Sequence, residues 1–269
     1  MEVLNMYDQL KIFVFESQLL PGILVLLLGL SVWAGRSLGL YQKKHAAGAK
    51  LKPDEISVAA IFGLMSLLVT FTFSGAYDRF ENRRNLLVAE YNTISTAYQA
   101  VDLLPAPLQP KVRDEFQILL DLRIDLYTDV QDHEVFEGRL RLFEESSNRL
   151  WKDVVAAVNA TPYPKYLVAA QLLTAVSAMN DALENRRMAL KQHLPTMIYA
   201  LLLLVLLIGA FLAGYNQATT ESRDWTMVPI YVVVTVAVFY ITINLEHPLA
   251  GVISLDDFHA EIINLRKSM

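Results

Sequence analysis

Four long apolar stretches without any charged side chain constrain this sequence more than any other feature. They cover residues of about 17–35, 57–76, 196–215 and 227–245. Each has roughly 19 or 20 residues, enough for a helix to cross a hydrocarbon core of about 30 Å. The sequence therefore predicts an all-α, polytopic membrane protein with four transmembrane helices.

The expected organisation has four parts. These are residues 1–76 with the first two spans, a helical extramembrane insert at 77–194, the last two spans at 195–247, and a tail at 248–269. An even number of spans places the insert and both termini on one side of the bilayer. We expect that side to be cytoplasmic, although the lysine and arginine counts of the two sides are nearly tied.

The insert has the pattern of long helices that continue from the membrane. Apolar residues recur every seven positions at Phe80, Leu87, Ile94 and Val101, so the second span is predicted to run on as one helix. Prolines between 105 and 110 end it. Further helices are predicted from about 111, from 135 to 160, and from 165 towards the third span. The last of these is expected to extend the third span outside the bilayer.

Composition excludes several classes of function. The chain has no cysteine, which removes disulfides, zinc ribbons and thiol nucleophiles. Its formal net charge is −5, whereas a nucleic-acid binder normally carries an excess of basic residues. No nucleic-acid partner is therefore expected. A G-x-S-x-G pattern at 35–39 resembles a nucleophile elbow, but it leaves a membrane helix instead of joining a strand to a helix. We predict no enzyme activity, no cofactor and no metal site.

One face of the second span is small and polar. Ser66, Thr70 and Ser74 follow one another at four-residue steps, Tyr77 continues the stripe, and Phe73 lies beside it. Such a face either packs against another helix or lines a wet pathway, in which Phe73 or Phe71 is a candidate constriction. Because no span contains an ionisable Asp, Glu, Lys or Arg, a passive pore or a structural role is favoured over an ion-coupled transporter.

Charged residues collect where the second and third spans leave the membrane. The sequence Glu-Asn-Arg-Arg occurs at 81–84 and again at 184–187, at similar distances from the membrane. If the two helices are neighbours, Glu81 pairs with Lys191 and the arginines form a basic collar, which becomes a ring in a symmetric oligomer. The alternative is that the arginines anchor lipid headgroups and pair with Glu three residues earlier in their own helix. The predicted charge network comprises Arg79, Glu81, Arg83, Arg84, Glu184, Arg186, Arg187 and Lys191.

Several longer motifs resemble a known family. They are F-S-G-A-Y-D-R-F-E-N-R-R at 73–84, E-Y-N-T-I-S-T-A-Y at 90–98, L-E-N-R-R-M-A-L-K-Q-H-L-P at 183–195 and L-E-H-P-L-A-G-V-I at 245–253. In these motifs the chain resembles the bestrophin-like domain family of bacterial membrane proteins. The resemblance implies four spans, an intracellular helical insert and a ring-shaped channel with its pore along the second span.

The leading hypothesis is a homo-oligomeric ion channel in the inner membrane of a bacterium, in contact with the lipid bilayer and passing inorganic ions. Anions are the first expectation, and cations stay open. The competing hypothesis is a non-conducting membrane scaffold or sensor whose helical insert binds a cytosolic partner.

Overall fold

The computed structural model describes residues 19–45, 55–126, 133–162, 165–190, 192–219, 226–246 and 256–269. Within these ranges the secondary structure is helical and contains no strand. The chain divides into two compact units: a membrane unit of Met1–Phe80 with His193–Ser254, and a helical unit of Glu81–Gln192 with Leu255–Met269. The predicted all-α fold is confirmed.

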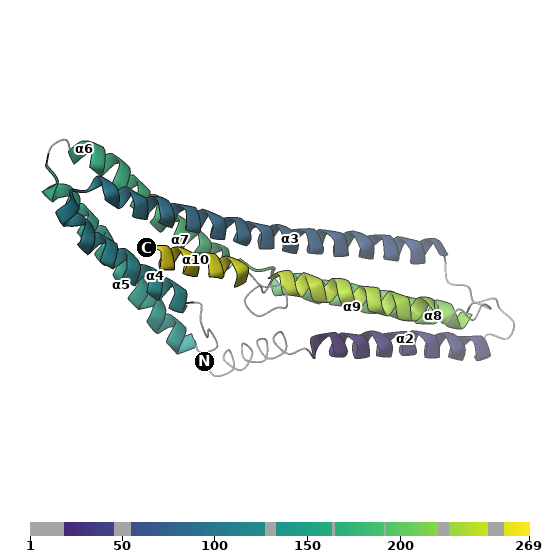
Figure 1. Cartoon of the computed structure of the whole chain (residues 1–269). Coiled ribbons are helices and arrows are strands. Elements are labelled where there is room, and N and C mark those ends of the chain that lie inside the picture. Colours follow the sequence, from purple (N-terminus) through teal and green to yellow (C-terminus); the bar gives the residue numbers. More distant parts are fainter. Residues whose placement is uncertain are drawn as a thin grey trace. The chain divides into compact units, whose positions relative to one another are not determined.

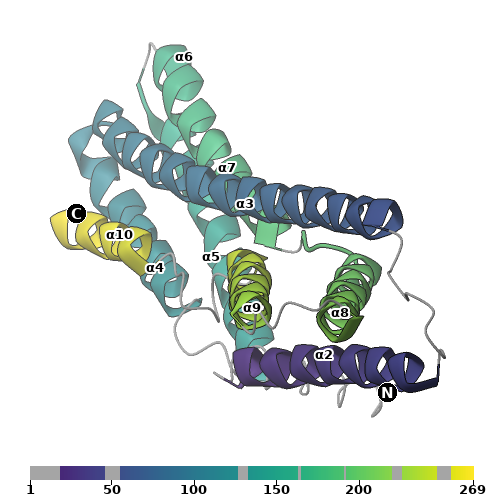
Figure 2. The same cartoon turned by 90° about the vertical axis from the view of Figure 1, so that its right-hand side faces the viewer.

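The membrane unit contains four helices long and apolar enough to cross a bilayer, as predicted. They are α2 (Leu20–His45), the first part of α3 (Glu55–Ala100), α8 (Thr196–Thr219) and α9 (Met227–Glu246) (Figure 1). In both views α8 and α9 lie between α2 and the membrane part of α3, by which we mean residues 55–80 (Figure 2). The second span continues outside the membrane without interruption, which confirms the extension predicted from the heptad pattern.

Glycines bring α2 and α8 into backbone contact. A Cβ atom on Gly35 would lie 2.0 Å from the carbonyl oxygen of Phe211, and one on Gly214 would lie 2.1 Å from that of Val32. Small residues allow this approach, which is a common way for helices to pack in membranes. Gly39, one turn after Gly35, is buried on the same face. The G-x-S-x-G pattern is therefore a helix-packing motif.

The helical unit is built from the rest of α3 and the helices that follow it. These are α4 (Gln109–Leu126), α5 (His133–Ala160), α6 (Lys165–Val168), the π-helical turn η3 (Ala169–Leu173), α7 (Thr174–Leu190) and α10 (Asp256–Ser268). At the proline cluster two short 3-10 turns, Val101–Leu103 and Ala106–Leu108, replace the α-helix. Residues 192–195 are not helical, so the extension of the third span is separated from α8 by a break next to Pro195.

The apolar faces predicted for the insert form the core of this unit. Ile94, Phe116 and Leu150, from three different helices, are buried together. The core also contains Ile262 of α10, and Arg266 of the same helix donates two hydrogen bonds to the carboxylate of Asp121, both at 2.8 Å. These hydrogen bonds raise the pKa of the Arg266 guanidinium further above its ordinary value. The second part of the chain's tail is thus a helix held in the core of the insert.

Candidate functional site

The polar stripe of α3 lies at the surface of the single chain. Only 11% of the most apolar stretch of α3 is buried, compared with 33% for α9. The membrane part of α3 is therefore left largely uncovered by its own chain, and its surface is available to lipid, water or another copy. All five predicted stripe residues are exposed: Ser66, Thr70, Phe73, Ser74 and Tyr77.

Two hydroxyl groups of the stripe donate to their own helix. The Ser66 hydroxyl donates to the carbonyl of Phe62 at 2.9 Å, and the Thr70 hydroxyl donates to that of Ser66 at 2.8 Å. This is the usual way in which a Ser or Thr satisfies its proton inside an apolar helix. The hydroxyl oxygens keep lone pairs that can accept a hydrogen bond or contact a cation.

Ser66 and Thr70 also line a cavity of about 490 Å³ between α3, α8 and α9. Across the cavity α9 contributes Thr235 and Thr242, and the rest of the lining is mainly apolar. Met65 closes one side, where its sulfur accepts a hydrogen bond from the Tyr231 hydroxyl at 3.5 Å. Hydroxyl groups from two helices therefore face one space in the membrane unit.

The two Glu-Asn-Arg-Arg motifs have the same internal arrangement. In each, the first arginine is buried: Arg83 is 3% exposed and Arg186 is 4% exposed. The second arginine reaches the surface and pairs with the motif's own glutamate, Arg84 with Glu81 at 3.3 Å and Arg187 with Glu184 at 3.4 Å. These are the intrahelical pairs of the alternative interpretation. A collar formed by all four arginines is not present, because two of them point into the helical unit.

Arg83 binds the end of α7. Its Nε donates to the carbonyl of Ala189 at 3.3 Å, and its Nη2 donates to that of Gln192 at 2.6 Å. Carbonyls at a helix C-terminus have no partner within the helix and carry partial negative charge, so a buried guanidinium stabilises them. Arg83 therefore fixes α3 to the point where α7 ends.

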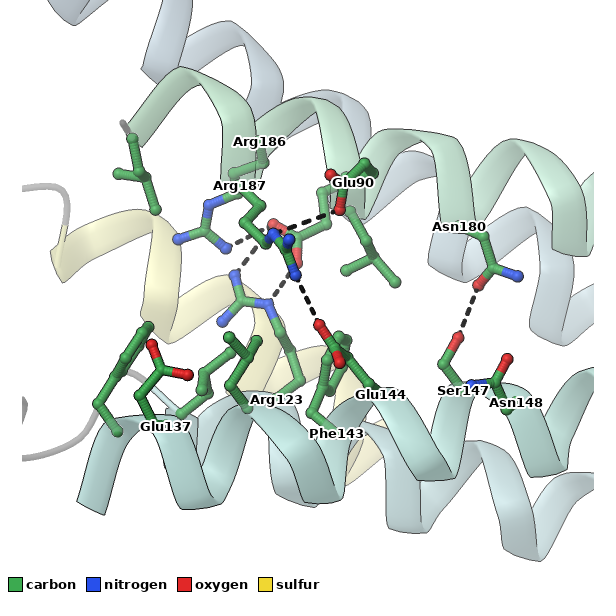
Figure 3. A pocket seen from close by; sticks show the side chains of 16 residues that line it. Glu90, Arg123, Glu137, Phe143, Glu144, Ser147, Asn148, Asn180, Arg186 and Arg187 are labelled. Atoms are coloured by element: carbon green, nitrogen blue, oxygen red, sulfur yellow. Dashed lines mark hydrogen bonds and ion pairs between the residues drawn. The ribbon is translucent and has the colours of Figure 1, made fainter. Parts of the chain in front are cut away.

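Arg186 takes part in a buried ion cluster with Glu90 of α3 and Arg123 of α4. Its Nη1 lies 2.6 Å from Oε2 of Glu90, which Arg123 Nη2 also approaches at 3.0 Å. Arg123 Nε donates to Oε1 of the same carboxylate. Figure 3 shows both guanidinium groups directed at Glu90 from separate helices. One carboxylate thus joins three helices.

The remaining charged residues lie in other pairs. Arg79 donates to the buried carboxylate of Glu246, at the end of α9, at 2.6 Å. Arg187 also contacts Glu144 of α5 at 2.6 Å. Lys191 lies outside the described residues, so its pairing with Glu81 stays a prediction.

Sequence reasoning missed Glu90, Arg123 and Glu246. A signal for the first two was present in the apolar periodicity. Glu90 follows Leu87 by three residues on the core face of α3, and Arg123 lies between buried leucines of α4. A charged residue at a core-facing position of each of two helices indicates a buried ion pair, since an unpaired buried charge is too costly to persist.

The comparison of the sequence with known families decides the classification. Residues 56–257, more than half of the chain, match the family described as Bestrophin-like domain. The chain belongs to the Bestrophin-like family. Together with its four apolar helices, this membership supports a membrane protein of the ion-channel type.

Solved structures agree with this family in fold. One variant of a bacterial bestrophin homologue from Klebsiella pneumoniae superposes with a TM-score of 0.66 at 12% identity, covering 93% of this chain and 99% of its own. Another variant of that homologue has a TM-score of 0.66 at 15% identity, covering 91% of this chain and 96% of its own. Curated proteins provide no match.

Proposed function

We propose that this chain assembles with copies of itself into an ion channel of the bacterial inner membrane. The pore is lined by the stripe of Ser66, Thr70, Phe73, Ser74 and Tyr77. The observation that carries the proposal is the largely uncovered membrane part of α3, which bears hydroxyl groups on one face.

Two faces of the same helix segment differ in chemistry. The face with Ser66 and Thr70 offers hydroxyl oxygens, whereas a neighbouring exposed face carries Leu64 and Phe71. The apolar face suits lipid or a neighbouring subunit. The hydroxyl face suits water, since polar groups directed into hydrocarbon cost free energy. In a symmetric ring, the hydroxyl faces would meet at the axis.

The chemistry of the stripe supports passive conduction. The described membrane spans carry no Asp, Glu, His, Lys or Arg between residues 56 and 76, or from 227 to 245, that would serve as a proton relay. Phe73 supplies a bulky apolar side chain among the hydroxyl groups, as expected of a hydrophobic constriction. Ions would therefore cross hydrated, past hydroxyl groups and the aromatic rings of Phe73 and Tyr77.

We expect weak selectivity between anions and cations. Inward-donating hydroxyl groups present lone pairs, which favour cations, whereas Arg84 continues the stripe outside the membrane and favours anions. The charge of Arg84 is partly offset by Glu81, its partner at 3.3 Å. Because the hydroxyl groups and Arg84 favour ions of opposite charge, we expect the channel to pass both anions and cations.

A conductance measurement tests the proposal. Full-length protein, purified in detergent and reconstituted into planar bilayers, should pass current, and its mass in detergent should be a multiple of 30.3 kDa. A monomeric mass with no current at any voltage, pH or Ca²⁺ concentration would contradict the channel. That outcome would favour a non-conducting scaffold whose helical unit binds a partner.

Replacing Arg84 by glutamine is expected to shift the reversal potential in a salt gradient towards cation preference, because a positive charge is removed and Glu81 loses its partner at 3.3 Å. The shift should be largest in dilute salt, where charges act over more than about 10 Å. Arg149→Gln is the matched control, since Arg149 is about as exposed, 52% against 49%, and belongs to α5. Equal reversal potentials for Arg84→Gln and the unmodified channel would show that Arg84 does not act on the permeating ions.

A further inference from the structure

The cavity between α3, α8 and α9 has the size of a ligand site and opens at the depth of the membrane. Its volume of about 490 Å³ falls within the range of about 300–1,000 Å³ found for small-molecule sites. Ile230 and Val234 of the span α9 line it and are 55% and 56% exposed. A ligand would therefore enter from the bilayer.

The polar groups of the lining offer acceptors of hydrogen bonds. Four hydroxyl groups already donate their proton to a backbone carbonyl, at distances from 2.7 to 3.3 Å: those of Ser66, Thr70, Tyr231 and Thr242. The fifth, that of Thr235, forms a hydrogen bond with Tyr231. Each hydroxyl oxygen keeps a lone pair after its proton is used. The cavity therefore favours a ligand that donates a hydrogen bond.

The lining does not suit a charged ligand. None of the described residues that line the cavity is Asp, Glu, His, Lys or Arg. An ion at this depth would lack a partner of opposite charge, and burying an unpaired charge is costly. Apolar side chains such as Leu202, Leu206 and Phe239 make up most of the lining. The ligand should therefore be uncharged and mainly apolar.

A plain hydrocarbon chain gains little by entering this cavity. Lipid tails are as apolar as leucine side chains, so a chain that moves from the bilayer into the cavity exchanges one apolar environment for another. A hydroxyl group gains more, because it has no partner in hydrocarbon and meets acceptor oxygens in the cavity. The lining thus distinguishes an apolar molecule with a hydroxyl group from one without it.

We propose that this cavity binds an uncharged amphiphile dissolved in the membrane, a phenol or alcohol with an apolar body. Its hydroxyl group would donate to a hydroxyl oxygen of α3 or α9, and its body would lie against the leucines of α8. Phe73, Ser74 and Tyr77 of the stripe do not line the cavity. The ligand would therefore lie beside the proposed pore, and its binding does not depend on conduction.

Photolabelling of the full-length protein in phosphatidylcholine vesicles tests the proposal. The probe is a phenol that carries a trifluoromethyldiazirine, and mass spectrometry identifies the modified peptides. The competitors are 4-butylphenol, butylbenzene without the hydroxyl group, and the charged 4-butylbenzoate, compared at equal concentration in the bilayer. We expect 4-butylphenol to suppress labelling of residues 227–242 saturably. Butylbenzene should need roughly tenfold more, the factor expected for one hydrogen bond, and 4-butylbenzoate should not compete.

Three results would overturn the proposal. Equal competition by butylbenzene would indicate a site for hydrocarbon chains, and equal competition by 4-butylbenzoate would indicate a site that accepts charge. Absence of saturable labelling in residues 227–242 would indicate that lipid or a second copy of the chain fills the cavity. Because no current is measured, each of these results leaves the proposed channel unaffected.

Two variants of α9 locate the binding. Val238 lines the cavity, so Val238→Trp should fill it and abolish the labelling that 4-butylphenol suppresses. Val233 is 65% exposed and does not line the cavity, so Val233→Trp should leave this labelling unchanged. Helix content and elution volume show that each variant is folded. Labelling retained by a folded Val238→Trp would contradict the proposed site, and the competitor series on the unmodified protein decides the matter if that variant does not fold.

Discussion

Replacing Glu90 by glutamine should lower the free energy of unfolding of the helical unit by about 3–5 kcal/mol. Glu90 is fully buried and is contacted by Arg123 and Arg186, each less than 5% exposed. Glutamine keeps the shape but removes the negative charge, so Arg123 and Arg186 both lose the carboxylate that they share. Loss of thermal stability, followed by circular dichroism in detergent, is the measurement.

Two other variants separate the charge effect from the effect of altering α3. Glu81→Gln breaks a surface pair in the same helix, and pairs of that kind contribute about 1 kcal/mol or less. Removing all three charges with Glu90→Met, Arg123→Met and Arg186→Leu should recover most of the stability, because the carboxylate and both guanidinium groups that it contacts are then removed together. A triple variant less stable than Glu90→Gln would show that the ion cluster itself stabilises the helical unit, and that the loss in Glu90→Gln is not only an effect of charge.

Gly35→Ala should destabilise the membrane unit by about 1–3 kcal/mol or more, although alanine is the better helix former. The added methyl group would lie 2.0 Å from the carbonyl oxygen of Phe211, which belongs to the backbone and cannot rotate away. Helices α2 and α8 must therefore move apart along their contact. Thermal unfolding in detergent measures the loss.

Gly29 supplies the matched control in the same helix. A Cβ atom there would have no neighbour within 4 Å, so Gly29→Ala should be neutral or slightly stabilising. Gly214→Ala should cost about as much as Gly35→Ala, because its methyl group would meet Val32 at 2.1 Å. Since both changes separate the same two helices, the double variant should cost less than the sum of the two. Strict additivity would contradict a shared contact.

The sequence predicted the helices better than their tertiary partners. The length of the uncharged apolar stretches predicted the four spans, and the seven-residue repeat through Leu87 and Ile94 predicted the continuous helix α3. The pairing of α2 with α8 was not predicted, because the small residues at Gly35 and Gly214 show that close packing is possible without naming the partner. The tail helix α10 was also not predicted. Its core residues Ile262 and Leu265 lie among charged and polar residues such as Glu261, Asn264 and Arg266.

The duplicated motif shows the same limit. Its position near the membrane was readable, and the pairs of Glu81 with Arg84 and Glu184 with Arg187 follow from helical spacing. That Arg83 and Arg186 turn inward depends on two distant groups, the end of α7 and the carboxylate of Glu90. Contacts between residues about 100 positions apart have no local signature in a single sequence.

The most direct measurement of the proposed pore uses single cysteines, because the natural chain contains none. Thr70→Cys and Thr72→Cys are compared in planar bilayers before and after a charged methanethiosulfonate reagent. Thr70 is exposed on the proposed pore face, whereas Thr72, two residues on, is 7% exposed on the other side of α3. The reagent reacts with a thiolate, which forms in water and not in lipid.

We expect the reagent to remove most of the current through Thr70→Cys until a reductant cleaves the disulfide, and to leave the current through Thr72→Cys unchanged. Block of Thr72→Cys alone, or an unchanged current after complete modification of Thr70→Cys, would contradict a pore lined by this face of α3.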